Sequence, residues 1–298
     1  MSTIKKIQYN VVVFALVSVS LIGAALAQGA ENAGAEKPLI ITTIKPLAII
    51  AKSAVGENAR VEFLQSAVQS AHEVTLPVSA LVKIDKAELV IWIGRGFEAR
   101  IGKSMALLPE AKKITVMDLE MIAADPNTNP DHHDHHHHQQ LQFDPHIWLN
   151  PANGNILASN IQKRLGLPQS AVINSRLVER LNAELEPVKD RNYLTHHDAF
   201  AHFVAAFNIS SGLSIRDASG ASQGARSQYM LRQKALALNA SCIFVEPQYA
   251  DKDARIIARE LNLPLTVIDP QGFDQPLTAD AYSKFMLGLV SQFKACFE

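Results

Sequence analysis

The stretch PLIITTIKPLAIIAKSAV, residues 38–55, contains the pattern that repeats along the chain. It begins with an apolar, β-branched run at Leu39–Thr43, which predicts a buried strand, and continues with the helix-length segment Leu47–Val55. A second helix-length segment follows at Ser79–Ala87, with Ser79 as a candidate N-cap. Alternating strands and helices predict a parallel sheet with helical crossovers. The further apolar runs of this first α/β lobe are Val61–Leu64, Leu89–Ile93 and Ile114–Met117.

A second series of the same kind predicts a second α/β lobe. Its helical segments lie near Tyr229–Leu238 and Asp253–Leu261. A final helix is expected from an N-cap at Thr278 through Phe293, because apolar residues recur there every three or four positions. The strands of this lobe are predicted at Tyr193–Thr195, Cys242–Glu246 and Leu265–Asp269.

Two helical patterns lie between these series, around Ile161 and around Leu181, and Gly166 and Pro168 separate them. The second pattern predicts a connecting helix over residues 168–191, about six turns long. It fits an ordinary surface helix within one lobe equally well, and both alternatives stay open. The expected layout is an N-terminal lobe over 38–167, the connecting helix, and a C-terminal lobe over 192–298.

The first 27 residues have the three-part layout of a secretory signal peptide. Lys5 and Lys6 precede the mainly apolar Val11–Leu26, and the small residue Ala27 ends the run. This run is shorter than the roughly 20 residues that a membrane anchor needs, so we expect cleavage and a soluble, exported chain. Residues 28–37 then form a flexible leader. A retained N-terminal anchor is the alternative.

Net charge and cysteine content bear on the class of partner and on the compartment of the protein. The formal net charge is −1, and removing the two lysines of the signal peptide lowers it to −3, which argues against a nucleic-acid partner. Cys242 and Cys296 are the only cysteines, and an oxidising compartment predicts a bridge between them. Closing a loop of roughly 55 residues would stabilise the fold by about 4 kcal/mol. Two buried free thiols are the alternative.

Residues 123–142 break the order of strands and helices. Without apolar periodicity they are expected to form a disordered, solvated loop, with the histidines as a weak, multidentate zinc collector or as part of a linker with incidental metal affinity. An expression tag is not favoured, because the run is internal and interrupted by Asp134. The histidines of this loop are His132, His133, His135, His136, His137 and His138.

Three other histidines lie just beyond or between regular elements, where a doubly wound sheet places its ligands. They are His72, His146 in DPHIWLNP, and His197, which follows a predicted strand. Asp269 ends another predicted strand, so three imidazoles and one carboxylate could fill a tetrahedral zinc shell. Each histidine taken alone also fits a packed or solvated residue. His196 and His202 are expected to lie outside the shell, His202 as a surface or packing residue.

Seven segments in order resemble the cluster A-I, or cluster 9, solute-binding proteins of metal ABC transporters. They run from TTIKPLAII at Thr42 through AHEVTL, AELVIWIG, DPHIWLNP, HHDAF and CIFVEPQY to IDPQG at Asp269. The resemblance implies two α/β lobes joined by one long helix, with metal bound in the cleft between them by His72, His146, His197 and Asp269. A histidine at position 197 and a His-rich loop look like the zinc branch, and so does the cysteine pair. The segment AHEVTLPVSA departs from the family pattern, which has an arginine and an aspartate after the histidine.

This resemblance implies a monomeric periplasmic protein that captures Zn²⁺ with high affinity and delivers it to an inner-membrane ABC permease. Zinc affinity should fall below about pH 6, because protons compete for the histidines. A periplasmic zinc buffer or chaperone, and a manganese- or iron-binding protein of the same fold, are the alternatives. A zinc hydrolase is not favoured, since Leu76 stands where the His72-Glu73 pair would need a second helical ligand.

Overall fold

The computed structural model describes residues 36–66, 70–119 and 144–298. The chain divides into two units, residues 1–37 and 38–298, and the second contains all the elements below. The predicted signal peptide (1–27), nearly all of the predicted leader and the His-rich loop at 123–142 lie outside the described residues. Within the described part of the chain, no helix has both the length and the apolar character needed to cross a membrane.

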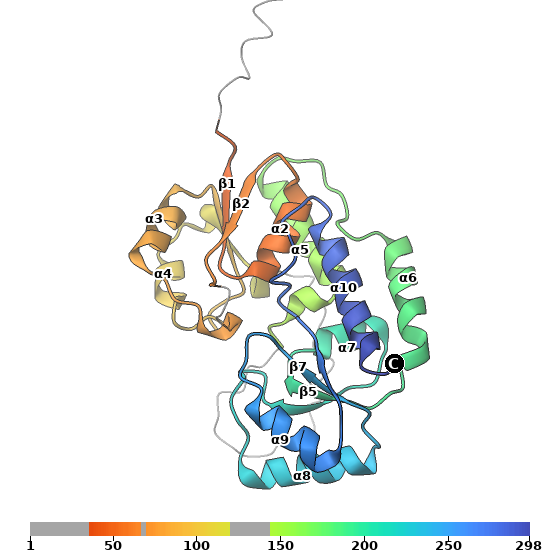
Figure 1. Cartoon of the computed structure of the whole chain (residues 1–298). Helices are drawn as coiled ribbons and strands as arrows, with labels where there is room; N and C mark the ends of the chain where they lie inside the picture. Colours follow the sequence, from red (N-terminus) through yellow and green to blue (C-terminus); the bar gives the residue numbers. More distant parts are fainter. Residues whose placement is uncertain (1–35, 67–69, 120–143) are drawn as a thin grey trace, which may run out of the picture. The chain divides into compact units, whose positions relative to one another are not determined.

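The first half of this unit forms a four-stranded parallel sheet in the order β2-β1-β3-β4 (Figure 1). Its central strands β1 and β3 are the buried ones, as their continuous apolar sequences LIIT and LVIW predict. The register places Ile41 beside Val90. The strands are β1 (Leu39–Thr42), β2 (Arg60–Phe63), β3 (Leu89–Trp92) and β4 (Lys113–Thr115).

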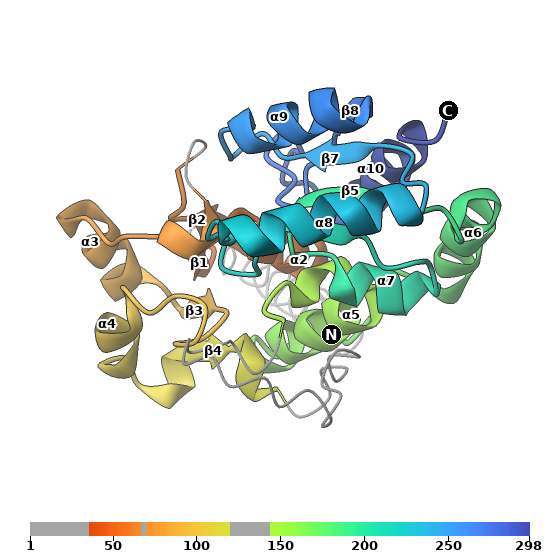
Figure 2. The same ribbon diagram turned by 90° about the horizontal axis from the view of Figure 1, so that it is seen from below.

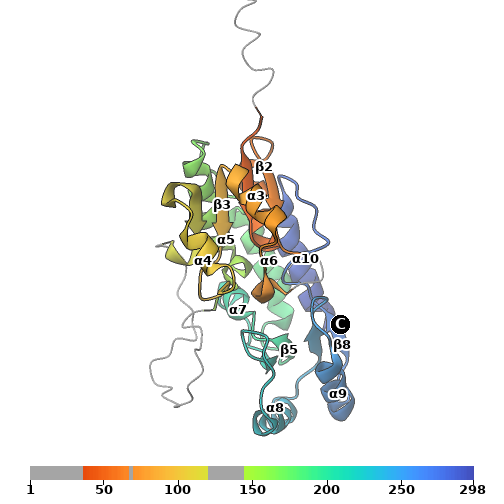
Figure 3. The same cartoon turned by 90° about the vertical axis from the view of Figure 1, so that its left-hand side faces the viewer.

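Helices cover both faces of this sheet. Figures 1 and 3 show α3 (Val78–Lys86) and α4 (Gly102–Ala106) on one side, with α2 (Lys45–Val55) and α5 (Pro151–Arg164) on the other. α3 begins directly after Pro77, so Ser79 lies inside the helix and the predicted cap is wrong. Pro77 itself is the N-cap residue and has an extended backbone, with φ −64° and ψ 162°.

The second half forms another four-stranded parallel sheet, in the order β6-β5-β7-β8. Strand β6 was not predicted, because its short segment LSIR has a single fully buried residue, Ile215. The strands are β5 (Leu194–His197), β6 (Leu213–Arg216), β7 (Ile243–Val245) and β8 (Leu265–Val267). The two parallel α/β halves confirm the predicted fold class.

Alternating residues of this second sheet face two different cores. Ile243 and Val245 pack with α8 (Ala225–Ala237) and α9 (Lys252–Leu261), which Figure 2 shows crossing one face of the sheet. Phe244 points the other way, where its ring stacks on Phe293 of α10 (Ala281–Ala295) at 5.2 Å. Helix α7 (Ala201–Phe207) packs on that side as well, through the Phe203–Phe293 contact.

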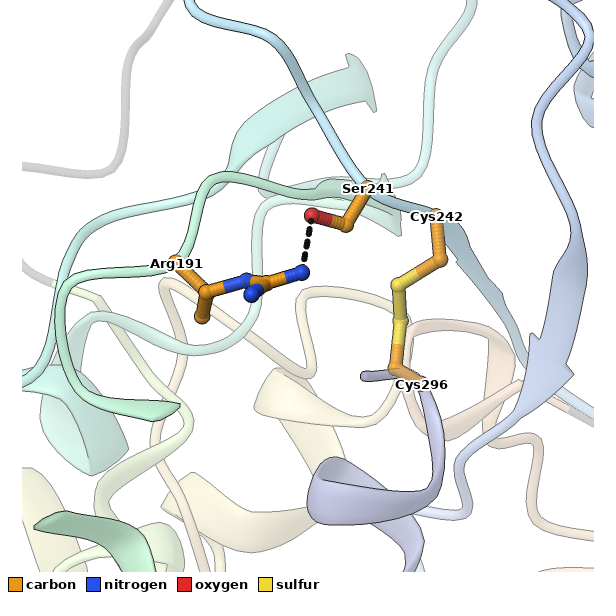
Figure 4. Close-up of a disulfide and its surroundings, with 4 residues drawn as sticks. All are labelled: Arg191, Ser241, Cys242 and Cys296. Carbon is orange, nitrogen blue, oxygen red and sulfur yellow. Dashed lines mark hydrogen bonds between the residues drawn. A yellow bond between two sulfur atoms is a disulfide. The ribbon is translucent and has the colours of Figure 1, made fainter. Parts of the chain in front are cut away.

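The C-terminal helix α10 belongs to the core of both halves. It packs against α2 and α6 (Figure 1), and its buried residues share one apolar cluster with strands β1 and β3. The helix begins at Ala281 and not at a Thr278 cap, because the Thr278 hydroxyl bonds to the Asp280 carboxylate at 2.7 Å. Cys296, at its end, forms the predicted disulfide with Cys242, with Cα atoms 5.9 Å apart (Figure 4). Beside it, Arg191 donates a hydrogen bond to Ser241.

The helical part of the predicted connecting segment 168–191 is shorter than expected. Helix α6 spans Ser175–Leu185, and a single 3-10 turn at Glu186–Val188 follows it. The Asn174 side chain accepts a hydrogen bond from the Leu177 amide, so it caps the helix and fixes its start. The part of the connecting segment before Asn174 is therefore not helical.

Candidate metal centre

Three histidines from distant parts of the chain meet at one point. His72, His146 and His197 each offer one ligand atom, and these atoms lie within 4.8 Å of one another. They form the only group of this kind among the described residues. The predicted convergence of the three imidazoles is therefore present.

Each histidine is held by a different local structure. His72 lies in a 3-10 turn, Ala71–Glu73, and its amide donates to the Ser70 side chain. His146 directly precedes another 3-10 turn, Ile147–Leu149. His197 is the last residue of β5, at the carboxyl end of the second sheet. Three separate segments of the chain thus supply the three rings.

Two of the rings have a carboxylate behind them. His146 Nδ1 lies 2.6 Å from Asp144 Oδ1, which also accepts the His146 amide at 2.9 Å. His197 Nδ1 lies 2.5 Å from Glu246 Oε1. A carboxylate at Nδ1 places the proton there and leaves the lone pair on Nε2. The two Nε2 atoms accordingly face each other, 3.3 Å apart.

The third ring, that of His72, packs against an aromatic side chain. His72 packs edge-on against Phe97, with ring centroids 4.3 Å apart, and its centroid lies 5.3 Å from that of His146. Its Nε2 atom is buried and has no hydrogen-bond partner. A buried nitrogen without a partner is unfavourable, so this atom is ready to bind a ligand that the cavity admits.

Burial keeps two of the imidazoles neutral. Loss of solvation, followed by repulsion from the other two histidines, lowers the pKa of His72 to about 2. Burial likewise lowers the pKa of His146 well below its ordinary value. For His197 burial acts in the same direction, but the adjacent Glu246 carboxylate outweighs it and raises the pKa. Neutral imidazole is the form that binds a metal.

The histidines surround a small cavity of about 10 Å³, which is room for one water molecule or one ion. Side chains from the two halves of the unit meet over it: the hydroxyls of Ser70 and Tyr249 lie 2.9 Å apart, and the Gln65 and Gln271 side chains lie 2.5 Å apart. Tyr249 and Gln271, one from each of these pairs, belong to the lining of the cavity. Its lining consists of Ala71, His72, His146, Trp148, His197, Glu246, Tyr249, Pro270 and Gln271.

Asp269, the predicted fourth ligand, does not belong to the group of ligand atoms. One of its oxygens accepts from the Gln248 side chain at 2.8 Å and from the Gln271 amide at 3.0 Å. The other accepts from the Phe273 amide at 2.8 Å. Strand β8 ends at Val267, two residues earlier than predicted, and the Asp269 carboxylate accepts its hydrogen bonds within the turn that follows.

The remaining described histidines lie outside the group, as predicted. His202 is buried and not at the surface, and its Nε2 bonds to the carbonyl of Asp144 at 2.9 Å. His196 is fully buried beside Asp253, 3.3 Å away. Sequence reasoning missed Asp144 and Glu246 as partners of the ligands. The short spacing in DPH could have indicated the first, whereas the second depends on strand register.

A known protein family matches the chain along most of its length. The family model described as ZnuA, zinc-uptake complex component A periplasmic, matches residues 40–172 and 174–296. The high-affinity zinc uptake system proteins ZnuA of Haemophilus ducreyi and Yersinia pestis are each 28% identical over 286 and 287 residues. Those alignments cover 86% of this chain and 92% and 90% of the relatives.

Solved structures show the same fold. A ZnuA deletion mutant with zinc bound superposes with a TM-score of 0.70 at 21% identity, covering 87% of this chain and 97% of the other. The periplasmic zinc-binding protein TroA from Treponema pallidum gives 0.69 at 16% identity, covering 87% and 99%. The family model covers most of the sequence, and the fold agrees along nearly the whole described length. The chain therefore belongs to the ZnuA family, the periplasmic component A of zinc-uptake complexes.

Proposed function

We propose that this chain captures Zn²⁺ between His72, His146 and His197 and releases it to the permease of an ABC transporter in the inner membrane. The observation that carries the proposal is the convergence of three imidazoles, two of them buried, on one ion-sized cavity. As a component of a ZnuA-type uptake system, the chain is a solute-binding protein and not an enzyme.

The donor set supports zinc over harder cations. Three neutral imidazole nitrogens suit zinc, copper or nickel, whereas manganese and magnesium prefer carboxylate and carbonyl oxygen. Zinc accepts four ligands in a tetrahedral arrangement, and water can take the fourth place. With Asp269 bonded within its own turn, we assign the fourth place to water.

Three further parts of the proposal come from the sequence. Residues 1–27 direct export to the periplasm and are removed, and the mature chain acts as a monomer. The histidines at 132–138 collect zinc weakly and raise its concentration near the cavity. Zinc capture at the three-histidine centre does not depend on this loop.

Zinc titration of the metal-free protein against a chromogenic chelator tests the centre. His72→Ala, His146→Ala and His197→Ala should each weaken binding by more than about 100-fold, a larger effect than removing a residue that only supports a ligand. His196→Ala is the matched control, because it removes a buried histidine next to His197 that lies outside the group. Tight binding in all three ligand variants, or tighter binding of Mn²⁺ than of Zn²⁺, would contradict the assignment.

A strain that lacks the gene tests delivery. We expect it to grow poorly when a chelator limits zinc, and to recover with the wild-type protein but not with His197→Ala. Deleting residues 123–142 should leave the tight site intact and remove only the weaker binding. Unchanged zinc uptake in the deletion strain would instead indicate a periplasmic zinc store without a transport role.

A further inference from the structure

Glu246 reaches the metal centre through the pairing of two neighbouring strands. Strands β5 and β7 are parallel and adjacent, and their register places Thr195 beside Phe244. Two residues further along each strand stand His197 and Glu246. The same register therefore brings the glutamate next to the histidine at the carboxyl edge of the sheet.

The environment of Glu246 is unusual for a structural carboxylate. Its side chain is completely buried. One oxygen, Oε1, bonds to His197 Nδ1, and the other, Oε2, is buried without a hydrogen-bond partner. Burying a carboxylate is strongly unfavourable unless a positive charge or several donors compensate it. Among the described residues the ion-pair partner of Glu246 is His197, while the guanidinium of Arg216 pairs with Asp253.

We propose that Glu246 is the positioning residue that supplies the metal centre with negative charge, acting through His197. This inference rests on the proposed zinc function. In this proposal Glu246 supplies the carboxylate charge of the centre, which the sequence analysis had assigned to Asp269 as a ligand. The buried anion is compensated when a divalent cation binds on the opposite side of the imidazole ring.

The geometry gives Glu246 two effects on binding. By accepting the Nδ1 proton, it fixes the tautomer in which Nε2 faces the cavity. By polarising the ring, it makes Nε2 a stronger donor. Asp144 has the same relation to His146, but it also accepts the His146 amide and so supports the backbone turn. A change at Glu246 therefore separates the electrostatic role from a folding role more cleanly than a change at Asp144.

The test compares Glu246→Gln with two controls in the full-length protein. Gln keeps the size and an oxygen that accepts the Nδ1 proton, but it removes the charge. We expect zinc affinity to fall by about 10- to 100-fold, as is typical when a supporting carboxylate is lost. Asp269→Asn should change zinc affinity by less. Glu260→Gln, at a half-exposed pair with Arg232, should leave it unchanged.

Two further measurements distinguish a loss of zinc affinity caused by the missing charge from one caused by misfolding. The Co²⁺-loaded Glu246→Gln protein should show shifted visible absorption bands, because the donor strength of His197 changes, while the melting temperature of the metal-free protein does not fall. Glu246→Asp retains the charge and should bind zinc more tightly than Glu246→Gln. Equal losses in the Asp and Gln variants would overturn the electrostatic role.

Two other results are equally informative. Zinc affinity of Glu246→Gln within about twofold of wild type, with an unchanged Co²⁺ spectrum, would overturn the inference and leave the proposed function intact. Absence of tight zinc binding in the wild-type protein would overturn both.

Discussion

The Nε2 atoms of His146 and His197 lie 3.3 Å apart, although the residues are separated by 51 positions in the sequence. Two nitrogens bound to one tetrahedral zinc ion, each at 2.0–2.1 Å, are separated by about 3.3–3.4 Å. The spacing of this pair therefore matches that of two zinc ligands before any movement of the backbone. Their carboxylate partners hold both rings in that orientation.

Zinc affinity should decrease as the pH falls, with His197 as the main cause. The pKa of His197 is raised, so zinc must displace a proton from it once the pH falls through that raised pKa. His72 and His146 have lowered pKa values and stay neutral. We expect about one decade of affinity lost per pH unit once His197 is protonated, measured by competition titration between pH 8 and 5.5. A slope of two or three decades would mean that the other histidines also take up protons.

Tyr249→Phe should speed zinc release. The Tyr249 hydroxyl bonds to Ser70 across the cavity, and its ring lies 5.0 Å from that of His197. Losing a hydrogen bond worth about 1 kcal/mol should raise the dissociation rate about fivefold, which stopped-flow mixing with a chelator can measure. Tyr229→Phe, at an exposed position on α8, is the control. Equal rates in both variants would show that the Ser70 contact does not restrain the ion.

Gly154→Ala should destabilise the protein. A Cβ atom at this position of α5 would lie 2.2 Å from the Tyr282 ring, whose hydroxyl donates to the Trp148 carbonyl. Overpacking of this kind lowers the free energy of unfolding by about 1–3 kcal/mol. Gly288→Ala on α10 meets no atom within 4 Å, and alanine favours helices, so it should stabilise by up to about 1 kcal/mol. Denaturant unfolding of both variants measures the contrast, and a similar effect in both would contradict the packing argument.

Replacing both Cys242 and Cys296 by alanine should lower stability without changing zinc affinity. The bridge closes a chain separation of 54 residues, which corresponds to about 4 kcal/mol on the chain-entropy model. Neither cysteine lines the metal cavity. Thermal unfolding measures the loss of stability, and zinc titration of the same sample measures the affinity. A weakened affinity would show that the disulfide also affects the geometry of the metal centre.

Glu98→Gln should change how stability depends on pH. Burial raises the pKa of Glu98 to about 7, although its carboxylate accepts a hydrogen bond from the Ile93 amide at 2.7 Å. The unfolded chain loses this proton near pH 4.5, so the wild type loses up to about 3 kcal/mol as pH rises from 4.5 to 7. The variant has no such loss. Its unfolding free energy relative to wild type should therefore be larger at pH 8 than at pH 4, and a constant difference would contradict the assignment.

The sequence predicts the two sheets and the three imidazoles because those features are local. Apolar runs mark the strands, His197 ends one of them, and His146 stands in DPHIWLNP directly before a short apolar turn. The contacts of Asp269 could not be predicted, because they depend on where β8 ends and on amides that fold back upon the carboxylate. Glu246 was missed for a related reason, since its contact with His197 arises from the pairing of β5 with β7. Relations between strands carry no signal in a single sequence.

The packing of the C-terminal helix has a consequence for how the protein binds and releases zinc. Because α10 shares an apolar core with both halves, a large opening movement between the halves would expose buried side chains to water. Loading and unloading should then proceed through movements of short surface turns around a nearly unchanged body. A transporter that distinguishes the zinc-bound from the metal-free protein would then have to contact those turns.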